Sequence, residues 1–404
     1  MSEKEIPRLY KEKDDCCGCG ACLNSCPVSA IEMHQDSCGY LYPHIDEDKC
    51  IVCHSCIQSC NYQKSIIKNN PLLVYAAAIR DGGLLRKSSS GGIAAELSRV
   101  IINNKGVVYG AAYDKNWRVK HLRIDCEDNI FLLQGSKYVQ SDTGLSYQKV
   151  REDLESGNKV LFIGTPCQVD GLYGFLKKEY KSLTTIDLVC HGVPNAKMLS
   201  DYICFLENKY KGKIVGFTFR DKELGWGANG SAIIQGSDYR KRKIKIWESS
   251  SSYVKYFTNG WLYRENCYEC KYACSHRPGD ITLGDFWGIE KCHFEYLGKG
   301  RLDDKSGISM VMINTKRGGV LFDEIKNSTV CLPSSYEKAS LYNGNLKKPS
   351  KKGKRDEIVG LYRNGGWKAV DDRFVKQMGL KRYSGMIKSA LPIPIKRFLK
   401  HCLK

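Results

Sequence analysis

Hydrophobic and polar positions along residues 71–345 form two kinds of segment. Short apolar runs bounded by polar or glycine-containing turns are typical of strands, and apolar residues at helical spacing are typical of helices. The runs predict strands at 72–79, 106–113, 160–164, 183–189, 214–219, 231–234, 281–283 and 308–314. The helical spacing predicts helices at 91–103, 168–179 and 196–209. We therefore expect a mixed α/β body.

The first 70 residues differ, because cysteine spacing dominates them. The pattern C-x2-C-x2-C-x3-C occurs twice, at Cys16, Cys19, Cys22 and Cys26 and again at Cys50, Cys53, Cys56 and Cys60. This is the run of bacterial two-cluster ferredoxins, in which the fourth cysteine binds the other cluster. We assign one 4Fe–4S cluster to Cys16, Cys19, Cys22 and Cys60, and a second to Cys50, Cys53, Cys56 and Cys26.

Two details and one alternative accompany this assignment. Pro27 fits the ferredoxin pattern, whereas Asn61 stands where a second proline would be. Zinc or disulfides are the alternative, but zinc sites take four ligands in two pairs. Cys17 and Cys38 fall outside the pattern, so we expect free thiols there. The predicted fold class is α+β, an N-terminal two-cluster ferredoxin domain (1–70) followed by the α/β body (71–345).

Length and composition constrain the setting of the protein. A chain of 404 residues can form two or three domains with a substantial core. The N-terminal residues are charged and lack the apolar stretch of a signal peptide, and no apolar run is long enough to span a bilayer. Eight cysteines in a ferredoxin run indicate a reducing compartment. These features predict a cytoplasmic protein.

The formal net charge of +19 is unevenly distributed. Residues 1–70 hold 7 Lys and Arg against 10 Asp and Glu, whereas residues 341–404 hold 17 against 4. An acidic ferredoxin end argues against nucleic acid as a partner. Residues 346–404 form a predicted basic C-terminal tail that starts as a solvated linker and ends in short helical pieces. Its last part, 381–404, suits either peripheral contact with an anionic membrane or a helix packed on the body.

A second group of cysteines lies in the body. Cys167 follows a strand at the start of a helix, Cys190 ends a strand, and Cys267 and Cys270 form a C-x2-C pair. Each lies at an element terminus, where a thiolate can face a shared cavity and accept backbone N–H bonds. The four predict a third 4Fe–4S site, with zinc as the rival. Cys274 is an alternative to one of the four.

Two short segments of the body suit a phosphate or pyrophosphate. Residues 86–92 read RKSSSGG and precede the predicted helix at 91–103. Hydroxyls, basic residues and a glycine turn at a helix N-terminus favour an anion. The alternative is an N-capped loop with Ser90 as the cap. Residues 135–138, GSKY, offer a further cation and hydroxyls.

These motifs carry a resemblance to a known family. The chain resembles the β-subunits of coenzyme F420-reducing hydrogenases and dehydrogenases, here a bacterial single-chain form with a ferredoxin domain in front. The resembling residues are RKSSSGG at 86–92, GSKY at 135–138, GTPCQ at 164–168, CHGVP at 190–194, and CYEC followed by GDITLGDFWG at 279–288. The resemblance implies FAD and a 4Fe–4S cluster in the body. It assigns the cluster to Cys167, Cys190, Cys267 and Cys270, and FAD to Arg86, Ser88, Ser89, Ser90, Gly91, Gly92 and Lys137.

The expected function follows from these cofactors. Clusters carry single electrons and a flavin carries one or two, so the chain is expected to be a FAD-dependent iron–sulfur oxidoreductase with a small-molecule substrate. A surface-polysaccharide pathway is one expected setting. His191 is a candidate general acid, and the alternative is a histidine that only hydrogen-bonds near a cluster ligand. The alternative function is an electron-transfer subunit that feeds a partner enzyme. The expected redox partner is a ferredoxin, a reduced deazaflavin or a partner enzyme.

Overall fold

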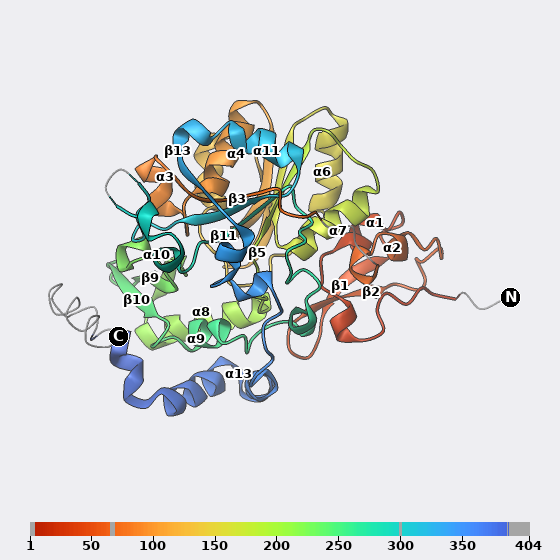
Figure 1. Ribbon diagram of the computed structural model, residues 1–404. Coiled ribbons are helices and arrows are strands. Elements are labelled where there is room, and N and C mark those ends of the chain that lie inside the picture. The colour runs from red at the N-terminus through yellow and green to blue at the C-terminus, as the bar shows by residue number, and fades with distance from the viewer. Residues whose placement is uncertain (1–4, 65–68, 299–300, 386, 388–404) are drawn as a thin grey trace.

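The centre of the computed structural model is an eight-stranded mixed sheet (Figure 1). The structure describes residues 5–64, 69–298, 301–385 and 387. The strand order is β13-β3-β12-β11-β7-β6-β4-β5. The strands are β3 (Leu73–Ile79), β4 (Val107–Tyr113), β5 (Val119–Ile124), β6 (Val160–Gly164), β7 (Leu183–Leu188), β11 (Ile281–Asp285), β12 (Ser309–Ile313) and β13 (Thr329–Ser334).

The four middle strands, β4, β6, β7 and β11, are parallel, and the strands beyond them pair antiparallel. Strands buried on both faces are continuously apolar, as in the VLFIG sequence of β6. Because side chains alternate between faces, Val107 and Tyr109 of β4 join one core cluster while Val108 joins another. The carboxyl ends of these parallel strands meet at one edge of the sheet.

Helices cover both faces of this sheet. Buried side chains of α4 and α11 pack on one face, and those of α6 and α7 pack on the other. Helix α7 starts with a capping box between Thr165 and Gln168, with Pro166 in its first turn. The helices are α3 (Gly82–Lys87), α4 (Ile93–Asn103), α5 (Ile130–Leu133), α6 (Ser146–Glu155), α7 (Pro166–Leu176), α8 (Ala196–Tyr210), α9 (Ser252–Thr258), α10 (Ile289–Cys292), α11 (Lys316–Asp323), α12 (Tyr336–Ser340) and α13 (Arg355–Met378).

A second layer packs α8, α9 and α13 against a three-stranded antiparallel sheet of β8 (Lys213–Thr218), β9 (Asn229–Gln235) and β10 (Lys241–Trp247). Helix α13 carries a break in helical geometry at Gly366. Its Trp367, Val370 and Phe374 are buried in the shared core. The described part of the basic tail is therefore a non-helical linker over residues 347–354, followed by two helical pieces that meet at Gly366 and pack on the body, as the sequence predicted. The proposed membrane contact falls largely on residues 386 and 388–404, which lie outside the described residues.

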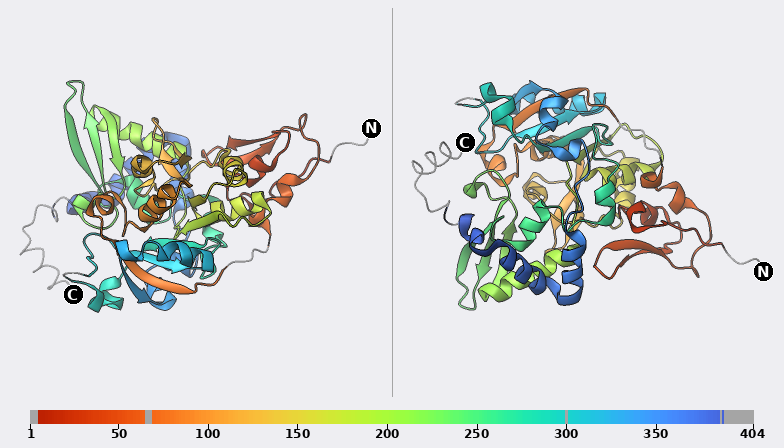
Figure 2. Two further views of the ribbon diagram at one scale, coloured as in Figure 1. Left: turned by 90° about the horizontal axis from the view of Figure 1, so that it is seen from above. Right: turned by 60° about the horizontal axis from the view of Figure 1, so that its bottom comes forward.

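The ferredoxin module lies on one side of the body (Figure 2). It consists of the hairpin β1 (Ile31–Gln35) and β2 (Leu41–Ile45), with the short helices α1 (Ala21–Ser25) and α2 (Ser55–Gln58). Ala21 of α1 is buried in the same core cluster as the apolar face of α7. The module and the body therefore share a packed junction at α7.

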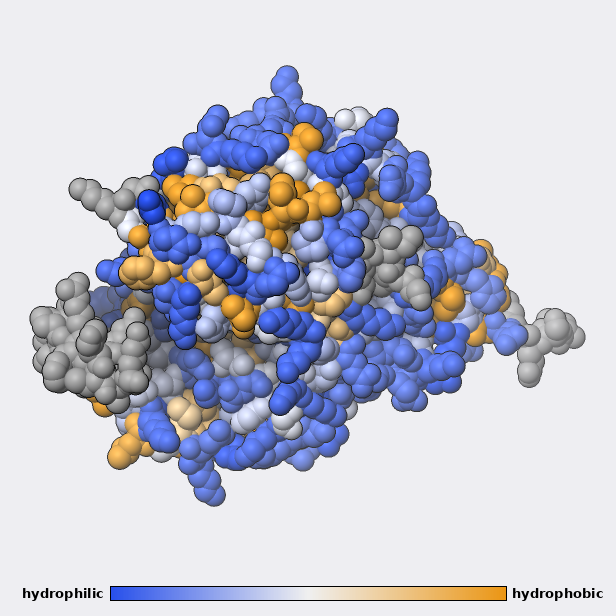
Figure 3. All heavy atoms as spheres, viewed as in Figure 1, coloured by the Kyte–Doolittle hydropathy of each residue, from blue (hydrophilic) through white to orange (hydrophobic). Residues whose placement is uncertain are grey.

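The sequence-predicted elements are largely confirmed. All eight predicted strands and all three predicted helices are present, with ends shifted by up to three residues. The prediction missed the body strands β5, β10 and β13, because their charged or proline-containing sequences interrupt the apolar pattern. It also missed the body helices α3, α5, α6, α9, α10, α11 and α12. Figure 3 shows a face that is largely hydrophilic, with apolar side chains gathered in separate areas. Within the described ranges, every helix is too short or too polar to cross a bilayer.

Candidate functional site

The two ferredoxin cysteine loops share one backbone conformation. Gly18 and Gly20 of the first loop have positive φ angles of 66° and 78°, and the equivalent Val52 and His54 have 54° and 58°. Valine and histidine rarely adopt this region, so the repeat holds its shape against local strain. Each loop leads directly into a short helix, α1 or α2. The duplication in the sequence is thus also a duplication of the fold.

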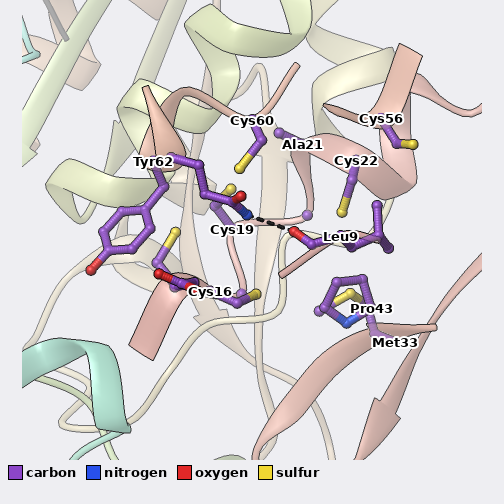
Figure 4. Close-up of a pocket in the computed structure, with 15 residues that line it drawn as sticks. Leu9, Cys16, Cys19, Ala21, Cys22, Met33, Pro43, Cys56, Cys60 and Tyr62 are labelled. Carbon is purple, nitrogen blue, oxygen red and sulfur yellow. Dashed lines mark hydrogen bonds between the residues drawn. The ribbon is translucent and has the colours of Figure 1, made fainter. Parts of the chain in front are cut away.

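The first predicted ligand set gathers around one space, which we call the inner ferredoxin site. Figure 4 shows Cys16, Cys19, Cys22 and Cys60 around this space, with Met33 and Pro43 closing one side. Burial raises the pKa of the Cys60 thiol to about 11, with a further rise from the nearby Cys19. Closely spaced buried thiols favour a bound metal group, because it makes their thiolate forms stable.

The second set, Cys26, Cys50, Cys53 and Cys56, lines a neighbouring space that we call the outer ferredoxin site. Backbone N–H groups of Ala30 and Val52 donate to the sulfurs of Cys26 (3.2 Å) and Cys50 (3.5 Å). Such N–H bonds stabilise thiolates that ligate iron. Cys53 is solvent-exposed, so this site faces the surface. Cys56 lines both spaces, which places the two sites side by side.

The third set forms the body site, and its cysteines come from three separate elements. Cys167 lies in the first turn of α7, Cys190 follows β7, and Cys267 and Cys270 lie in and after a single 3-10 turn, Glu265–Glu269. Strands β6 and β7 are parallel neighbours, so the residues that follow them reach the same edge of the sheet. The Cys267 N–H donates to the Arg264 carbonyl oxygen at 3.0 Å, which fixes the turn.

The four thiols of the body site influence one another electrostatically in all six pairings. Burial, followed by repulsion from Cys167, raises the pKa of Cys190 to about 12 and that of Cys270 to about 11. A backbone N–H bond lowers the pKa of each of these two thiols. Four mutually repelling buried thiols with N–H support fit a cationic iron group.

The alternatives for the body site can be compared with this geometry. The thiol of Cys274 lies within hydrogen-bonding distance of the Lys271 carbonyl (3.6 Å) and the His276 carbonyl (3.4 Å), in the segment beyond the four. Across the described part of the chain, no group of three or more His, Cys, Asp or Glu side chains is placed around one metal ion. The four ligands of a cluster bind separate irons, so they stand further apart than four ligands of one zinc.

Cys17, which sequence reasoning left outside the pattern, lies between two sites. It is 4% exposed and packs with Cys19 of the inner site and Cys167 of the body site. A hydrogen bond from Cys17 is the largest cause of the lowered pKa of Cys167. No spacing rule includes Cys17, because the contact joins residues far apart in the sequence. The three sites therefore lie in the order outer, inner, body.

Helix α7 joins the inner site to the body through two glycines. A Cβ on Gly171 would lie 2.7 Å from the Cys19 sulfur, and one on Gly174 would lie 2.2 Å from the Ser59 carbonyl oxygen. Only glycine permits this close approach. Asn61 stands where the ferredoxin pattern would have a second proline. Its Nδ2 donates to the carbonyl and carboxylate oxygens of Asp170, both at 3.1 Å. The departure from the ferredoxin pattern therefore serves docking.

The two predicted phosphate segments lie against each other. The Ser89 hydroxyl accepts bonds from the Ser136 N–H (2.6 Å) and Ser136 hydroxyl (2.9 Å). A Cβ on Gly91 would lie 2.2 Å from the Ala77 carbonyl oxygen, so this position requires glycine. Arg86 and Lys87 end helix α3 rather than starting α4, and Gly92 occupies the N-cap position of α4. The Ser90-capped alternative is therefore wrong: the Ser90 hydroxyl donates to the Ile308 carbonyl at 2.9 Å.

Three residues that the sequence did not single out lie beside these segments, together with Asp285 and Trp287 of the GDFWG motif: Arg220, Lys222 and Trp226. Arg220 donates to both carboxylate oxygens of Asp285, at 2.7 and 3.0 Å. The Trp226 Nε1–H also donates to Asp285, and its ring stacks on Trp287 at 4.7 Å. Lys222 donates to the Leu85 and Ser90 carbonyls, both at 2.6 Å, which ties this group to the 86–92 loop. Asp285 of GDFWG thus holds Arg220 and Trp226.

Unpartnered polar atoms test whether a cofactor fits here. The Gln134 Oε1 and the Tyr113 hydroxyl are buried and lack a hydrogen-bond partner among the described residues. Gln134 itself donates to Ser88, at 2.8 Å, so one orphan acceptor lies beside the serine loop. Lys137 donates to the carbonyls of Leu132, Leu133 and Gln134 at 2.8–3.1 Å, which caps α5. The orphan Oε1 is an acceptor, so it suits an N–H or O–H group of a bound cofactor, while Lys137 is used within the protein.

His191 lies near this group. The residue is exposed, yet burial of its ring lowers the pKa of His191, and Asp285 partly offsets this effect. The adjacent Cys190 belongs to the body site, so His191 lies between the body site and the Asp285 group.

The cysteine sites define an iron–sulfur protein. Residues 157–338 match the family described as the C terminus of the beta subunit of coenzyme F420 hydrogenase/dehydrogenase, and residues 9–32 match the 4Fe-4S binding domain. The chain therefore carries a C-terminal domain of this beta-subunit family over residues 157–338, with a 4Fe–4S binding domain ahead of it. The resemblance inferred from the motifs is confirmed.

Individual relatives are distant. An uncharacterised protein of Methanocaldococcus jannaschii is 22% identical over 80% of this chain and 89% of its own length. One of the subunits of the F420H2 dehydrogenase of Methanosarcina mazei is 24% identical over 39% of this chain and 47% of its own length. A chain of the F420-reducing NiFe hydrogenase complex of Methanosarcina barkeri is 17% identical, with a TM-score of 0.42, over 78% of this chain and 94% of its own.

Proposed function

We propose that this protein is an electron-transfer subunit that carries three 4Fe–4S clusters and FAD and exchanges electrons with a partner enzyme. The inner and outer ferredoxin sites hold two clusters, and Cys167, Cys190, Cys267 and Cys270 hold the third. Clusters exchange single electrons, and FAD exchanges one or two, so together they link one-electron and two-electron chemistry. The proposal is therefore the electron-transfer alternative of the sequence analysis, in place of an enzyme that reduces a substrate on its own.

The observation that carries the proposal is the continuous order of the three sites. Cys56 lines both ferredoxin spaces, and Cys17 contacts cysteines of both the inner and the body site. The outer site opens to solvent through Cys53, whereas Cys17 is buried. A surface-accessible entry followed by a shielded interior suits electron exchange with a partner. The similarity to part of a dehydrogenase complex supports a partner made of several chains.

The proposed FAD position is the 86–92 loop with Ser136. Here the Ser89 hydroxyl accepts two bonds from Ser136, which leaves its own O–H as a donor, and the orphan Gln134 Oε1 beside Ser88 is an acceptor. The Trp226–Trp287 stack and the Arg220–Asp285 pair border this region through Lys222. These residues orient a flat, anionic cofactor and shield it from water.

Cofactor analysis of anaerobically purified protein tests the proposal. We expect about twelve irons per chain and one FAD. Replacing Ser89 and Ser90 by leucine should release FAD, because bulky apolar side chains displace the hydroxyls, while iron stays unchanged. Ser237→Leu, in the exposed turn between β9 and β10, is the control. Stoichiometric FAD in the double variant would contradict this position.

A second candidate function is reduction of a small molecule at the flavin, and His191 favours it. This exposed residue lies near Asp285, and a histidine in such a position can donate a proton to a substrate. Substrate-dependent flavin reoxidation by the isolated chain, lost in His191→Asn, would support this function. A stable partner that copurifies and alone reoxidises the flavin would support the electron-transfer role.

A further inference from the structure

Arg264 places a buried positive charge at the junction between the body and the ferredoxin module. The residue is 0% exposed. Its Nε and Nη1 donate to the carbonyls of Cys16 (2.9 Å) and Leu41 (2.7 Å), and its guanidinium lies 3.9 Å from the Tyr42 ring centre. A side chain that starts just before Cys267 in the sequence therefore ends inside the ferredoxin module.

The other three buried arginines show what is unusual about this one. Arg220, Arg277 and Arg355 each lie 2.6–2.7 Å from a carboxylate oxygen, of Asp285, Asp187 and Glu265. For Arg264, the described residues include no carboxylate within 4.0 Å. A buried charge without an opposite charge is costly, so its compensation must come from elsewhere.

Thiolate ligands supply the negative charge near Arg264. Its Nη2 lies 3.7 Å from the Cys16 sulfur of the inner site, and its carbonyl accepts the Cys267 N–H of the body site. Electrostatic attraction to Cys16 and Cys267 supports the charged guanidinium. A cluster with four thiolates carries a net negative charge, and each reduction adds one more. The guanidinium is thus placed to respond to reduction.

We infer that Arg264 raises the reduction potential of the inner ferredoxin cluster above that of the outer cluster, so that an electron in the ferredoxin module is held preferentially at the inner site. Reduction adds one electron and no proton to the cluster, so a fixed cation in a dry interior stabilises the product. The outer site lies at the surface, and the cation acting on its Cys53 is Lys177, whose charge is screened by solvent. Arg264 acts on the cluster through its charge and is not one of its ligands. The inference rests on the proposed clusters.

A potentiometric titration of the anaerobic full-length protein, followed by electron paramagnetic resonance, tests this inference. Signals are assigned with Cys53→Ser, which removes a ligand of the outer site. Arg264→Gln should lower the reduction potential of the inner cluster and leave that of the outer cluster unchanged. Arg264→Lys keeps a positive charge, so its inner potential should stay close to that of the wild type. Lys177→Gln is the control and should not move the inner potential. A purely structural role of Arg264 would leave all potentials in place.

Gln140 offers a second variant that keeps Arg264 intact. A Cβ on Gly18 would lie 2.9 Å from the Gln140 Nε2 and 3.1 Å from the Arg264 Nη1, so the two side chains are close neighbours. Gln140→Glu should lower the inner potential by cancelling the cation, while Gln140→Leu, which also loses the bond to Cys17, should not. If Arg264→Gln does not assemble the inner cluster, the comparison of Gln140→Glu with Gln140→Leu tests the inference in its place.

The outcomes separate the inference from the proposed function. Unchanged inner potentials in Arg264→Gln, or in Gln140→Glu where the first variant lacks the cluster, overturn the role of Arg264. A wild-type chain with full iron but no redox-active inner cluster, or with iron missing from that site, overturns the proposed function instead. Iron content is measured on every sample for this reason.

Discussion

The ferredoxin sites and the body site bring their cysteine ligands together in opposite ways. All eight ferredoxin cysteines lie between residues 16 and 60, on two loops with the same backbone conformation. The body cysteines lie between residues 167 and 270 and meet because β6, β7 and the turn after Arg264 converge. The first arrangement is local, and the second depends on the whole sheet.

This difference predicts different sensitivities. Local loops keep their ligand spacing as long as the loop itself folds. The body site needs the start of α7 in place, and a chain of contacts holds it: the Gln168 Nε2 donates to the Ser141 carbonyl (2.9 Å), and the Ser141 hydroxyl bonds His121 (2.8 Å). Distant substitutions in the body should therefore affect its site, whereas the ferredoxin sites should tolerate them.

Loss of one body ligand is the largest expected effect. Cys267→Ser should lose about a third of the iron and retain the ferredoxin signals, because the two kinds of site are built independently. Iron analysis and absorption spectra measure this. Cys274→Ser is the control and should keep all the iron, since its thiol lies near the Lys271 and His276 carbonyls. One zinc with only the ferredoxin iron in the wild type would instead support a zinc site in the body.

Acid should weaken the body through His121. Burial lowers the pKa of His121 to about 4, while an unfolded histidine titrates near 6.5. The unfolded chain therefore binds the extra proton first, so stability is complete above about pH 6.5 and is lost as the pH falls toward about 4. The loss amounts to about 3 kcal/mol. In His121→Gln the free energy of unfolding, measured by chemical denaturation, should depend less on pH over this range. In the exposed control His34→Gln that dependence should remain. An equal slope in both variants would contradict the assignment.

Overpacking at the junction should separate the two regions. Gly171→Ala places a Cβ 2.7 Å from the Cys19 sulfur, so the free energy of unfolding should fall by about 1–3 kcal/mol, with loss of inner-site iron. Gly360→Ala in α13 is the matched control, because no atom lies within 4 Å of its Cβ position. That control should gain up to about 1 kcal/mol. Thermal unfolding with iron analysis measures both, and full inner-site iron in Gly171→Ala would refute the tight junction.

The smallest expected effect concerns docking without ligation. Asn61→Ala removes the bonds to Asp170 and should cost about 1 kcal/mol of stability while all cysteine sites keep their iron. Exposed Asn116→Ala serves as the control for chemical denaturation. A loss of iron in Asn61→Ala would show that the missing proline matters for cluster binding rather than for docking.

Much of the fold and of the ferredoxin sites could be predicted from the sequence by itself. Cysteine spacing led to the eight proposed ferredoxin ligands and their crossed assignment, because cluster geometry requires a fixed number of residues between ligands. The apolar run VLFIG predicted β6, since buried parallel strands are commonly apolar throughout, and the β-branched sequence LTTIDL predicted β7. The same reasoning placed Cys167 and Cys190 at the ends of elements, from which a shared site follows once the strands are neighbours.

The tertiary structure alone decided what lies between these pieces. Cys17 and Arg264 have no spacing signature, because their partners are distant in sequence: Cys167 for the first and Cys16 for the second. Gly171 resembles an ordinary helix residue until the Cys19 sulfur is placed against it. Sequence patterns encode local geometry and burial, whereas the distance between two sites arises only when separate elements pack. The order of the three cysteine sites, and the cation between two of them, belong to that second kind of information.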